Sequence, residues 1–236
     1  MTWSAPVAEV ILALDLPNGT EAWRLLDRVP DARWVKVGSI LMTREGAPFV
    51  RELIGRGYQV FLDLKWHDIP NTVAGAVMAA RELGVSMATV HAIGGRSMME
   101  AAAVAAGGDL ALVGVTILTS HDAASYGRSV GRREANLADE TVRHAKEAAG
   151  AGLSGVVCSP IEVTWVRQVL PDDALIVVPG IRRQGEVAGD QVRTATATEA
   201  VRAGATHLVV GRPVLQAADP ALALRGFYQE AGCLSS

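Results

Sequence analysis

The segments LIVVPGIR (residues 175–182) and HLVVGRP (residues 207–213) decide the fold. Each contains a short, nearly continuous apolar run and then passes through a glycine to an arginine. Parallel strands that are buried on both faces have this character, whereas half-exposed antiparallel strands alternate apolar and polar residues. The two segments therefore predict strands of a parallel sheet, each followed by a loop that carries a cation.

Similar apolar runs occur along the rest of the chain, separated by Ala-rich amphipathic stretches. The further predicted strands are 10–14, 34–37, 58–64, 87–91, 110–118 and 155–158, and the clearest predicted helices are 72–83, 97–106, 137–149 and 198–203. Alternation of strand and helix patterns is typical of βαβ units around a parallel sheet. Eight units in 236 residues leave about 30 residues for each, which is the size of one βα repeat.

The predicted fold is therefore of the α/β class, a single (β/α)8 barrel of the TIM type. A doubly wound open sheet is the alternative. We expect one domain over residues 1–236, because no linker, low-complexity tract or charge run marks a boundary. The two longest predicted connections, 119–136 and 179–196, follow the fifth and seventh strands. In a barrel both would lie on the catalytic face, where loops carry function.

Composition excludes several classes of protein. Lys and Arg number 22 against 25 Asp and Glu, so no basic excess is available to neutralise a nucleic-acid backbone. No apolar run approaches the roughly 18–20 residues needed to span a membrane. Two cysteines are too few for a disulfide framework or a structural zinc site, and the first residues do not form a signal peptide. We expect a soluble, cytoplasmic protein that binds neither nucleic acid nor membrane.

Charged residues are scarce within the predicted strands, and the exceptions lie at one end of them. Asp15 follows the first strand, Lys36 comes late in the second, and Asp63 and Lys65 end the third, with Asp68 just beyond. The C-terminal ends of barrel strands converge on one mouth, so these groups should meet there. Asp63 and Lys65 are two residues apart and should point to the same side of a strand. Such an alternating network fixes the protonation state of each group without a metal ion.

A simpler interpretation of DLKWHDIPNT (residues 63–72) is a solvated strand exit. In that case Asp68 or Asn71 would cap the helix that follows. Asp15 and Lys36 argue against this interpretation, because they occupy equivalent places on two other strands.

A second group of candidate residues lies near the C-terminus: Arg182, Gln191, Gly211 and Arg212. The loops after strands seven and eight of a βα barrel frequently hold a phosphate group. Gly211 would let the backbone approach the anion, and Arg212 would supply a charged, forked donor. The alternative is a simple turn with a surface arginine.

Two other patterns carry no site. Gly150, Gly152 and Gly155 match G-x-G-x-x-G, but they lie after a predicted helix and before a strand, the reverse of a dinucleotide-binding turn. We interpret them as a helix end and turn. The five histidines have no ligand-like spacing, so we expect no metal site.

Seven motifs together resemble one enzyme family. They are ALDLPN (13–18), VKVG (35–38), DLKWHDIPNT (63–72), VTILTS (115–120), PGIR (179–182), GDQ (189–191) and VVGRPV (209–214). In this order they resemble the bacterial orotidine 5′-phosphate decarboxylases, from the first strand to the last. The resemblance implies a βα barrel that acts as a homodimer with composite active sites and needs no metal or organic cofactor. The implied reaction converts orotidine 5′-monophosphate to uridine 5′-monophosphate, the last step of de novo pyrimidine nucleotide synthesis.

The resemblance also implies a role for each catalytic candidate. Lys65 matches the lysine that protonates the pyrimidine carbon as carbon dioxide departs. Asp63 matches the acid set against the leaving carboxylate, and Asp68 the acid that reaches into the neighbouring subunit's site. Lys36 and Asp15 match the residues that hold the network and the ribose hydroxyls.

The remaining implied contacts are with the substrate alone. Thr119 and Ser120 fall where the family contacts the base, and Thr72 ends the substrate-binding motif. The implied phosphate contacts are Arg182, Gln191, Gly211 and Arg212.

Two other functions remain to be weighed. One is a magnesium-dependent sugar-phosphate decarboxylase or aldolase, which shares D-x-K-x-x-D but places an acidic metal ligand where this chain has Lys36. The other is a catalytically silent barrel that binds a nucleotide as a sensor or structural subunit. A mere binder has no use for Asp63 opposite a carboxylate.

Overall fold

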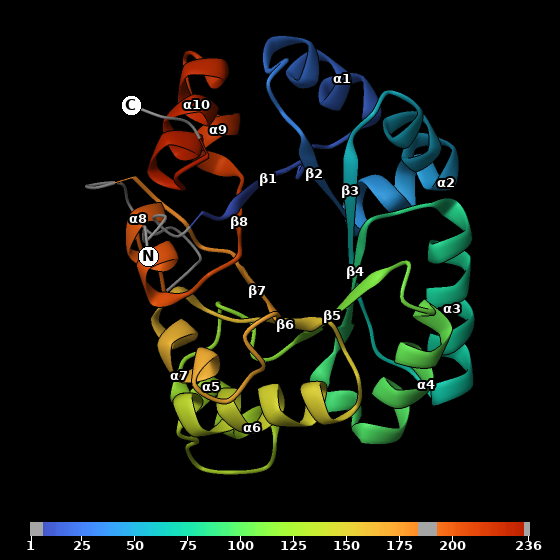
Figure 1. Ribbon diagram of the computed structural model, residues 1–236, viewed down its shortest axis with the longest axis vertical. Coiled ribbons are helices and arrows are strands. Elements are labelled where there is room, and N and C mark those ends of the chain that lie inside the picture. Colours follow the sequence, from blue (N-terminus) through green and yellow to red (C-terminus); the bar gives the residue numbers. More distant parts are fainter. Residues whose placement is uncertain (1–6, 184–192, 234–236) are drawn as a thin grey trace, which may run out of the picture.

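The computed structural model describes residues 7–183 and 193–233. Eight parallel strands form a closed barrel in the order of the sequence, and β1 pairs with β8 to complete it. The strands are β1 (Glu9–Ala13), β2 (Trp34–Gly38), β3 (Gln59–Trp66), β4 (Met87–His91), β5 (Ala111–Val115), β6 (Gly155–Val157), β7 (Leu175–Val178) and β8 (His207–Val210). Figure 1 shows the strands as an inner ring with the helices outside it. The predicted (β/α)8 barrel is confirmed, and the open sheet is wrong.

Helices follow the strands and cover the outside of the barrel. They are α1 (Gly19–Arg28), α2 (Ser39–Gly55), α3 (Pro70–Leu83), α4 (Arg96–Ala106), α5 (Ala123–Ser129), α6 (Leu137–Gly150), α7 (Val163–Arg167), α8 (Ala197–Ala203), α9 (Arg212–Leu215) and α10 (Pro220–Glu230), with 3-10 turns η1 (Ala92–Gly94) and η2 (Pro160–Glu162).

Local sequence explains where several helices begin and end. The Asn18 side chain accepts the Glu21 amide at the start of α1, and Thr196 forms a reciprocal capping box with Glu199 at the start of α8. The G-x-G-x-x-G match spans the turn from α6 to β6, as its position in the sequence predicts. Among the described residues, no helix is both long enough and apolar enough to span a membrane.

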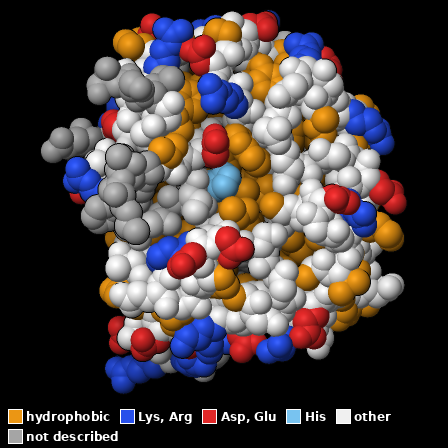
Figure 2. All heavy atoms as spheres, viewed as in Figure 1, with side chains coloured by type: hydrophobic (Ala, Val, Ile, Leu, Met, Phe, Trp, Pro, Cys, Tyr) orange, Lys and Arg blue, Asp and Glu red, His pale blue; other side chains and the backbone are white. Residues whose placement is uncertain are grey.

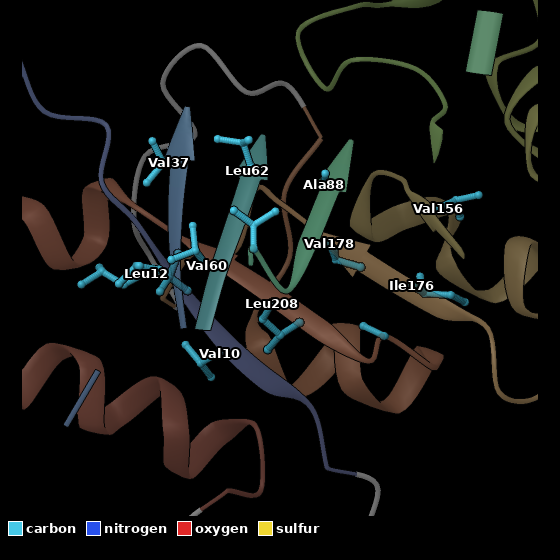
Figure 3. Packing of buried hydrophobic residues seen from close by; sticks show 14 of the residues in the cluster. Val10, Leu12, Val37, Val60, Leu62, Ala88, Val156, Ile176, Val178 and Leu208 are labelled. Carbon is cyan, nitrogen blue, oxygen red and sulfur yellow. The ribbon is translucent and has the colours of Figure 1, made fainter. Parts of the chain in front are cut away.

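The continuous apolar strands are explained by two hydrophobic layers. Alternate residues such as Val10 and Leu12 point outward and pack under the helices, as Figure 3 shows for residues of several strands. Their neighbours Ile11 and Ala13 belong to a second cluster inside the barrel, together with Phe61, Met87, Val113, Val177 and Val209. Because both faces of each strand are buried, no polar alternation is needed. The inner layer forms an apolar floor beneath the mouth of the barrel.

The fifth strand is shorter than predicted. β5 ends at Val115, and the apolar residues that follow leave the sheet. Ile117 packs with Tyr126 and Ala135 in a small separate cluster, because the connection after β5 contains its own helix, α5. Hydrophobicity in this segment reflects packing within the loop.

The surface carries charges of both signs. Figure 2 shows Lys and Arg side chains interspersed with Asp and Glu over the face in view, with no extended region of one sign among the coloured residues. This distribution agrees with the balanced charge of the sequence.

Candidate active site

A cavity of about 500 Å³ lies at the C-terminal ends of the strands. All the predicted site residues within the described ranges line it, with the exceptions of Asp68 and Thr72. Those that line it are Asp15, Lys36, Asp63, Lys65, Thr119, Ser120, Arg182, Gly211 and Arg212. The barrel thus brings together side chains that are separated by up to two hundred positions in the sequence.

Four charged side chains of alternating sign form a continuous chain across the first three strands. The Lys36 Nζ donates to Asp15 Oδ1 at 2.7 Å and lies 3.6 Å from Asp63 Oδ2. The other oxygen of Asp63, Oδ1, accepts from the Lys65 Nζ at 2.8 Å. Asp15 and Asp63 therefore each contact a lysine, and Lys36 bridges the two carboxylates.

The network keeps its central groups charged. Burial raises the pKa of Asp63, but the charges of Lys36 and Lys65 outweigh it, so the pKa lies below its ordinary value. Burial lowers the pKa of Lys36, and the charges of Asp63 and Asp15 more than compensate, so the pKa is raised. Both groups are thus ionised throughout the neutral pH range.

The backbone of Lys65 has an unusual conformation. Its φ angle is 53°, and it is the sole residue other than glycine with positive φ in the described part of the chain. The strand is irregular here, since the register between β3 and β4 shifts between Leu62 and Trp66. The Lys65 amide donates to the Thr89 Oγ1 at 2.8 Å. Alternation correctly predicts that Lys65 lies on the same side as Asp63, but the local backbone differs from a regular strand.

The connections after β7 and β8 bring the two predicted arginines to the same cavity. Gly180 adopts φ +83°, which favours glycine and lets the chain turn sharply after β7. Arg182 is only 7% exposed, and Arg212, which the alternative of a surface arginine concerned, is half-buried and lines the same cavity. Its amide donates to the Ala195 carbonyl at 3.0 Å, which joins the two described ends of this connection. Gln191, the remaining phosphate candidate, lies outside the described residues.

Asp68 and Thr72 lie apart from the cavity within this chain. Both are exposed, and the Asp68 Oδ1 accepts from the Ile69 amide at 2.6 Å. α3 begins after Ile69 without any side-chain cap, so the interpretation of Asp68 or Asn71 as the helix cap is wrong. Pro70 occupies the first turn and needs no amide partner there.

The described residues contain no group of three or more His, Cys, Asp or Glu side chains arranged to hold a metal ion. Asp15 and Asp63, the acids of the cavity, both contact Lys36.

Comparison with known proteins identifies the family. The profile of the "Orotidine 5′-phosphate decarboxylase / HUMPS family" matches residues 8–227. The chain belongs to this family. The resemblance seen in the sequence, and with it the prediction of a carboxy-lyase, is confirmed.

Similarity to individual members of the family extends over the whole fold. A protein of Halorhodospira halophila named orotidine 5′-phosphate decarboxylase is 49% identical over 221 residues, which cover 91% of this chain and 92% of that protein. A protein of the same name from Alkalilimnicola ehrlichii is 48% identical over 228 residues, which cover 94% of this chain and 96% of that protein. The crystal structure of orotidine 5′-phosphate decarboxylase from Lactobacillus acidophilus superposes with a TM-score of 0.84 at 36% identity, covering 95% of this chain and 99% of that one.

The structure also contains a buried ion pair next to a residue that lines the cavity, Leu118. Arg193 and Glu162 have side chains only 7% and 2% exposed, and their Nη1 and Oε1 atoms are in contact. Arg193 Nη2 also donates to the Leu118 carbonyl at 3.0 Å, one residue before Thr119. The pair therefore links the connection after β7 to the one after β5. Sequence reasoning missed it, because the two residues are 31 positions apart with no motif joining them.

Sequence reasoning also missed the apolar wall of the cavity. Its members include Phe61, Val115, Ile117, Cys158 and Leu215. Phe61 lies two residues before Asp63 on the same inward face of β3, so alternation along the strand was the signal that could have found it.

Proposed function

We propose that this protein is an orotidine 5′-phosphate decarboxylase, which converts orotidine 5′-monophosphate to uridine 5′-monophosphate in the last step of de novo pyrimidine nucleotide synthesis. The observation that carries the proposal is one cavity lined both by a Lys/Asp network and by two arginines. The substrate has two anionic groups, a phosphate and a ring carboxylate, and the two halves of the cavity suit them in turn. Relatives with this name match over nearly the full chain.

The phosphate would bind on the arginine side. Arg182, Gly211 and Arg212 supply this part of the cavity, and Gln191 is the further contact that the family resemblance implies. A guanidinium group offers several donors in a planar fork that matches phosphate oxygens.

The remaining candidates would orient the nucleoside. Asp15 and Lys36 would hold the ribose hydroxyls, and Thr119 with Ser120 would contact the base. Thr72 is the further substrate contact that the resemblance implies. Holding the reacting carbon at a fixed position beside Lys65 converts proton transfer into an intramolecular step.

The chemical step follows from the lysine and its acid. The bond between the ring carbon and the carboxylate breaks, carbon dioxide departs, and the bonding electron pair stays on the ring carbon. Lys65 Nζ donates a proton to that carbon, and the resulting amine takes a proton back from solvent. Asp63 remains ionised beside the leaving carboxylate, and the repulsion between the two anions is relieved as neutral carbon dioxide forms.

One lysine is insufficient for the rate. A charge pair at roughly 4 Å is worth about 4 kcal/mol at an effective dielectric constant near 20. Enzymes typically lower barriers by about 8–23 kcal/mol. The remainder must come from the preorganised network and from binding energy of the remote phosphate. This explains why both halves of the cavity are needed.

The magnesium-dependent rival and the silent barrel are tested by one assay. Purified protein should produce uridine monophosphate from orotidine monophosphate with EDTA present and no added cofactor. Loss of activity on chelation, restored by magnesium, would favour the rival, and the absence of any product would favour a nucleotide-binding barrel.

We also propose a homodimer with composite sites, completed by Asp68 of the partner. Asp68 is exposed and lies outside the charge chain of its own barrel. Large hydrophobic side chains are exposed in and near the segment that follows: Ile69 at 66%, Met78 at 51% and Ile93 at 41%. Such side chains would lose their exposed apolar surface if a partner subunit covered this segment. Pro70 favours an extended conformation at Ile69, and the chain leaves the barrel at this point.

Mixing two inactive variants tests the composite site. Asp68→Ala and Lys65→Ala proteins are combined under conditions in which subunits exchange. In a mixed dimer one site carries both changes and the other carries neither. Random exchange makes half of the dimers mixed, so activity should recover to about a quarter of wild type per site. If subunits demonstrably exchange and no activity returns, Asp68 acts within its own chain.

We propose further that residues 1–236 form a single decarboxylase domain. In support, the end of the described chain returns to its beginning, since the Ala8 amide donates to the Ala231 carbonyl at 3.1 Å. The cytoplasmic location stays a prediction from the sequence.

A further inference from the structure

We propose that Thr89 on β4 is a positioning residue that holds Lys65 and Asp63 in their reactive arrangement. This inference rests on the proposed function of Lys65 as proton donor. Thr89 is completely buried, so it cannot touch the substrate and must act through its neighbours.

Thr89 lies where the hydrogen-bond ladder between β3 and β4 is interrupted. Leu62 pairs with Ala88, and the next pairing joins Trp66 to Val90. Three residues of β3, Asp63 to Lys65, therefore face the single residue Thr89. A regular ladder cannot satisfy all the backbone groups of such a bulge. The Thr89 side chain supplies the missing acceptor, because its Oγ1 lies 2.8 Å from the Lys65 amide nitrogen.

This bond fixes an unfavourable backbone conformation at the proton donor. Lys65 has φ 53°, in the left-handed region that residues with a side chain seldom adopt. Such conformations persist where surrounding contacts hold them, and they cluster at active sites. The direction in which the Lys65 side chain leaves the strand depends on this φ, and Thr89 holds the amide that defines it.

The same hydroxyl also orients the acid. A threonine hydroxyl has one proton to donate and lone pairs to accept. Thr89 Oγ1 accepts from the Lys65 amide and donates to Asp63 Oδ1 at 3.2 Å. That oxygen also accepts from the Lys65 Nζ at 2.8 Å. The hydroxyl, the carboxylate and both nitrogens of Lys65 thus form a closed ring of hydrogen bonds, with Thr89 as the member that no substrate contacts.

The first test replaces Thr89 by valine, which has the same shape without the hydroxyl. The Lys65 amide and one position on Asp63 Oδ1 then lose their partner, and the lysine is free to relax away from the reacting carbon. We expect kcat to fall by about tenfold to a hundredfold, while KM changes by less than about threefold because the phosphate contacts are untouched. Equal changes in both parameters, or none, would overturn the proposal.

A second pair of variants separates the hydroxyl from the volume of the side chain. Thr89→Ser and Thr89→Ala both remove the methyl group and differ from each other in the hydroxyl alone. Ser should retain most of the wild-type kcat, and Ala should show the loss seen with Val. If Ser and Ala have the same kcat, the hydroxyl has no positioning role.

Thr206→Val provides the matched control. Thr206 Oγ1 accepts from the Ile176 amide at 2.9 Å, the same kind of bond, but just before β8 at the opposite end of the barrel. Its loss should lower thermal stability and leave kcat unchanged. A comparable fall in kcat with Thr206→Val would show that losing any threonine hydroxyl bonded to a backbone amide slows the enzyme, which contradicts a specific role for Thr89.

The outcomes also distinguish this inference from the proposed function. A wild-type protein that does not decarboxylate orotidine monophosphate refutes the function, whereas an active wild type, an inactive Lys65→Ala and a fully active Thr89→Val refute only the inference.

If the valine and alanine variants do not fold, hydrogen exchange of the Lys65 amide in the wild-type protein tests the inference instead. We expect a protected amide, and exchange at the rate of an unbonded one overturns the proposal.

Discussion

Replacing Lys36 by methionine should move the pH dependence of catalysis. Lys36 is 8% exposed and lies 2.7 Å from Asp15 and 3.6 Å from Asp63. Methionine has similar length and no charge, so the cavity stays filled while the cation between the two acids is lost. Burial raises the pKa of Asp63, and in this variant Lys65 is the remaining contacting cation that lowers it. The pKa of Asp63 should rise as a result.

The size of the effect follows from the geometry. At 3.6 Å and an effective dielectric constant near 20, the attraction between Lys36 and Asp63 is about 5 kcal/mol. This is an upper limit, because solvent and the remaining Lys65 cation partly compensate at Asp63 once Lys36 is lost. Even a third of it exceeds the roughly 1.4 kcal/mol that corresponds to one pH unit. We therefore expect the acid limb of the kcat/KM profile to move upward by at least about one pH unit.

The assay measures kcat/KM for orotidine monophosphate at closely spaced pH values from acid to neutral. Asp15→Asn is the matched control, because Asp15 contacts the same lysine but its side chain is 53% exposed and does not contact Asp63. It should raise KM and leave the acid limb in place. An acid limb of Lys36→Met that coincides with wild type would refute the electrostatic reasoning, whatever the loss in rate.

Three further predictions concern the phosphate site, the buried ion pair and the pH dependence of stability. Arg212→Ala should raise KM strongly and lower kcat/KM, because phosphate binding energy is used in the transition state; a phosphate-free substrate analogue should lose little rate, and an equal loss would show that Arg212 does not contact the phosphate. Arg193→Met leaves the buried Glu162 without its cation and should lower the free energy of unfolding by about 3–5 kcal/mol, which corresponds to a fall in Tm of roughly 6–20 °C by calorimetry. Arg96→Met, which breaks an exposed ion pair, should change Tm little, and similar Tm shifts in both variants would contradict the argument. The free energy of unfolding, measured in urea across pH, should fall on both sides of neutrality. The lowered pKa of Asp63 gives stability that is present above its ordinary value of 3.8 and lost as the pH falls through the folded value, whereas the raised pKa of Lys36 gives stability that is present below 10.5 and lost as the pH rises through the folded value. A free energy of unfolding that does not change at either end would contradict these shifts.

The fold could be predicted because its signals are local. Each strand is a short apolar run between amphipathic stretches, so eight strands could be located, and parallel pairing follows from their continuous hydrophobicity. The errors arose where hydrophobicity had another cause. The predicted fifth strand extends to Leu118, but the residues after Val115 line the cavity and pack within the loop.

Residues of the site could be predicted where charge marks the end of a strand. Asp15, Lys36 and Asp63 are conspicuous because they interrupt apolar segments. Thr89 and Arg193 give no such signal, since their roles come from partners 24 and 31 positions away. The distorted backbone at Lys65 was equally inaccessible, because alternation assumes a regular strand.

The pairing of β1 with β8 has a consequence for how the protein is made. The first strand, Glu9–Ala13, leaves the ribosome long before its neighbour on one side, His207–Val210. Until residues 207–210 emerge, β1 and β7 each have an unpaired edge that can join a foreign strand. The cavity has the same dependence, because it takes Asp15 from the beginning of the chain and Arg212 from near its end. We therefore expect a chain interrupted before β8 to lack part of the cavity wall and to be prone to aggregate.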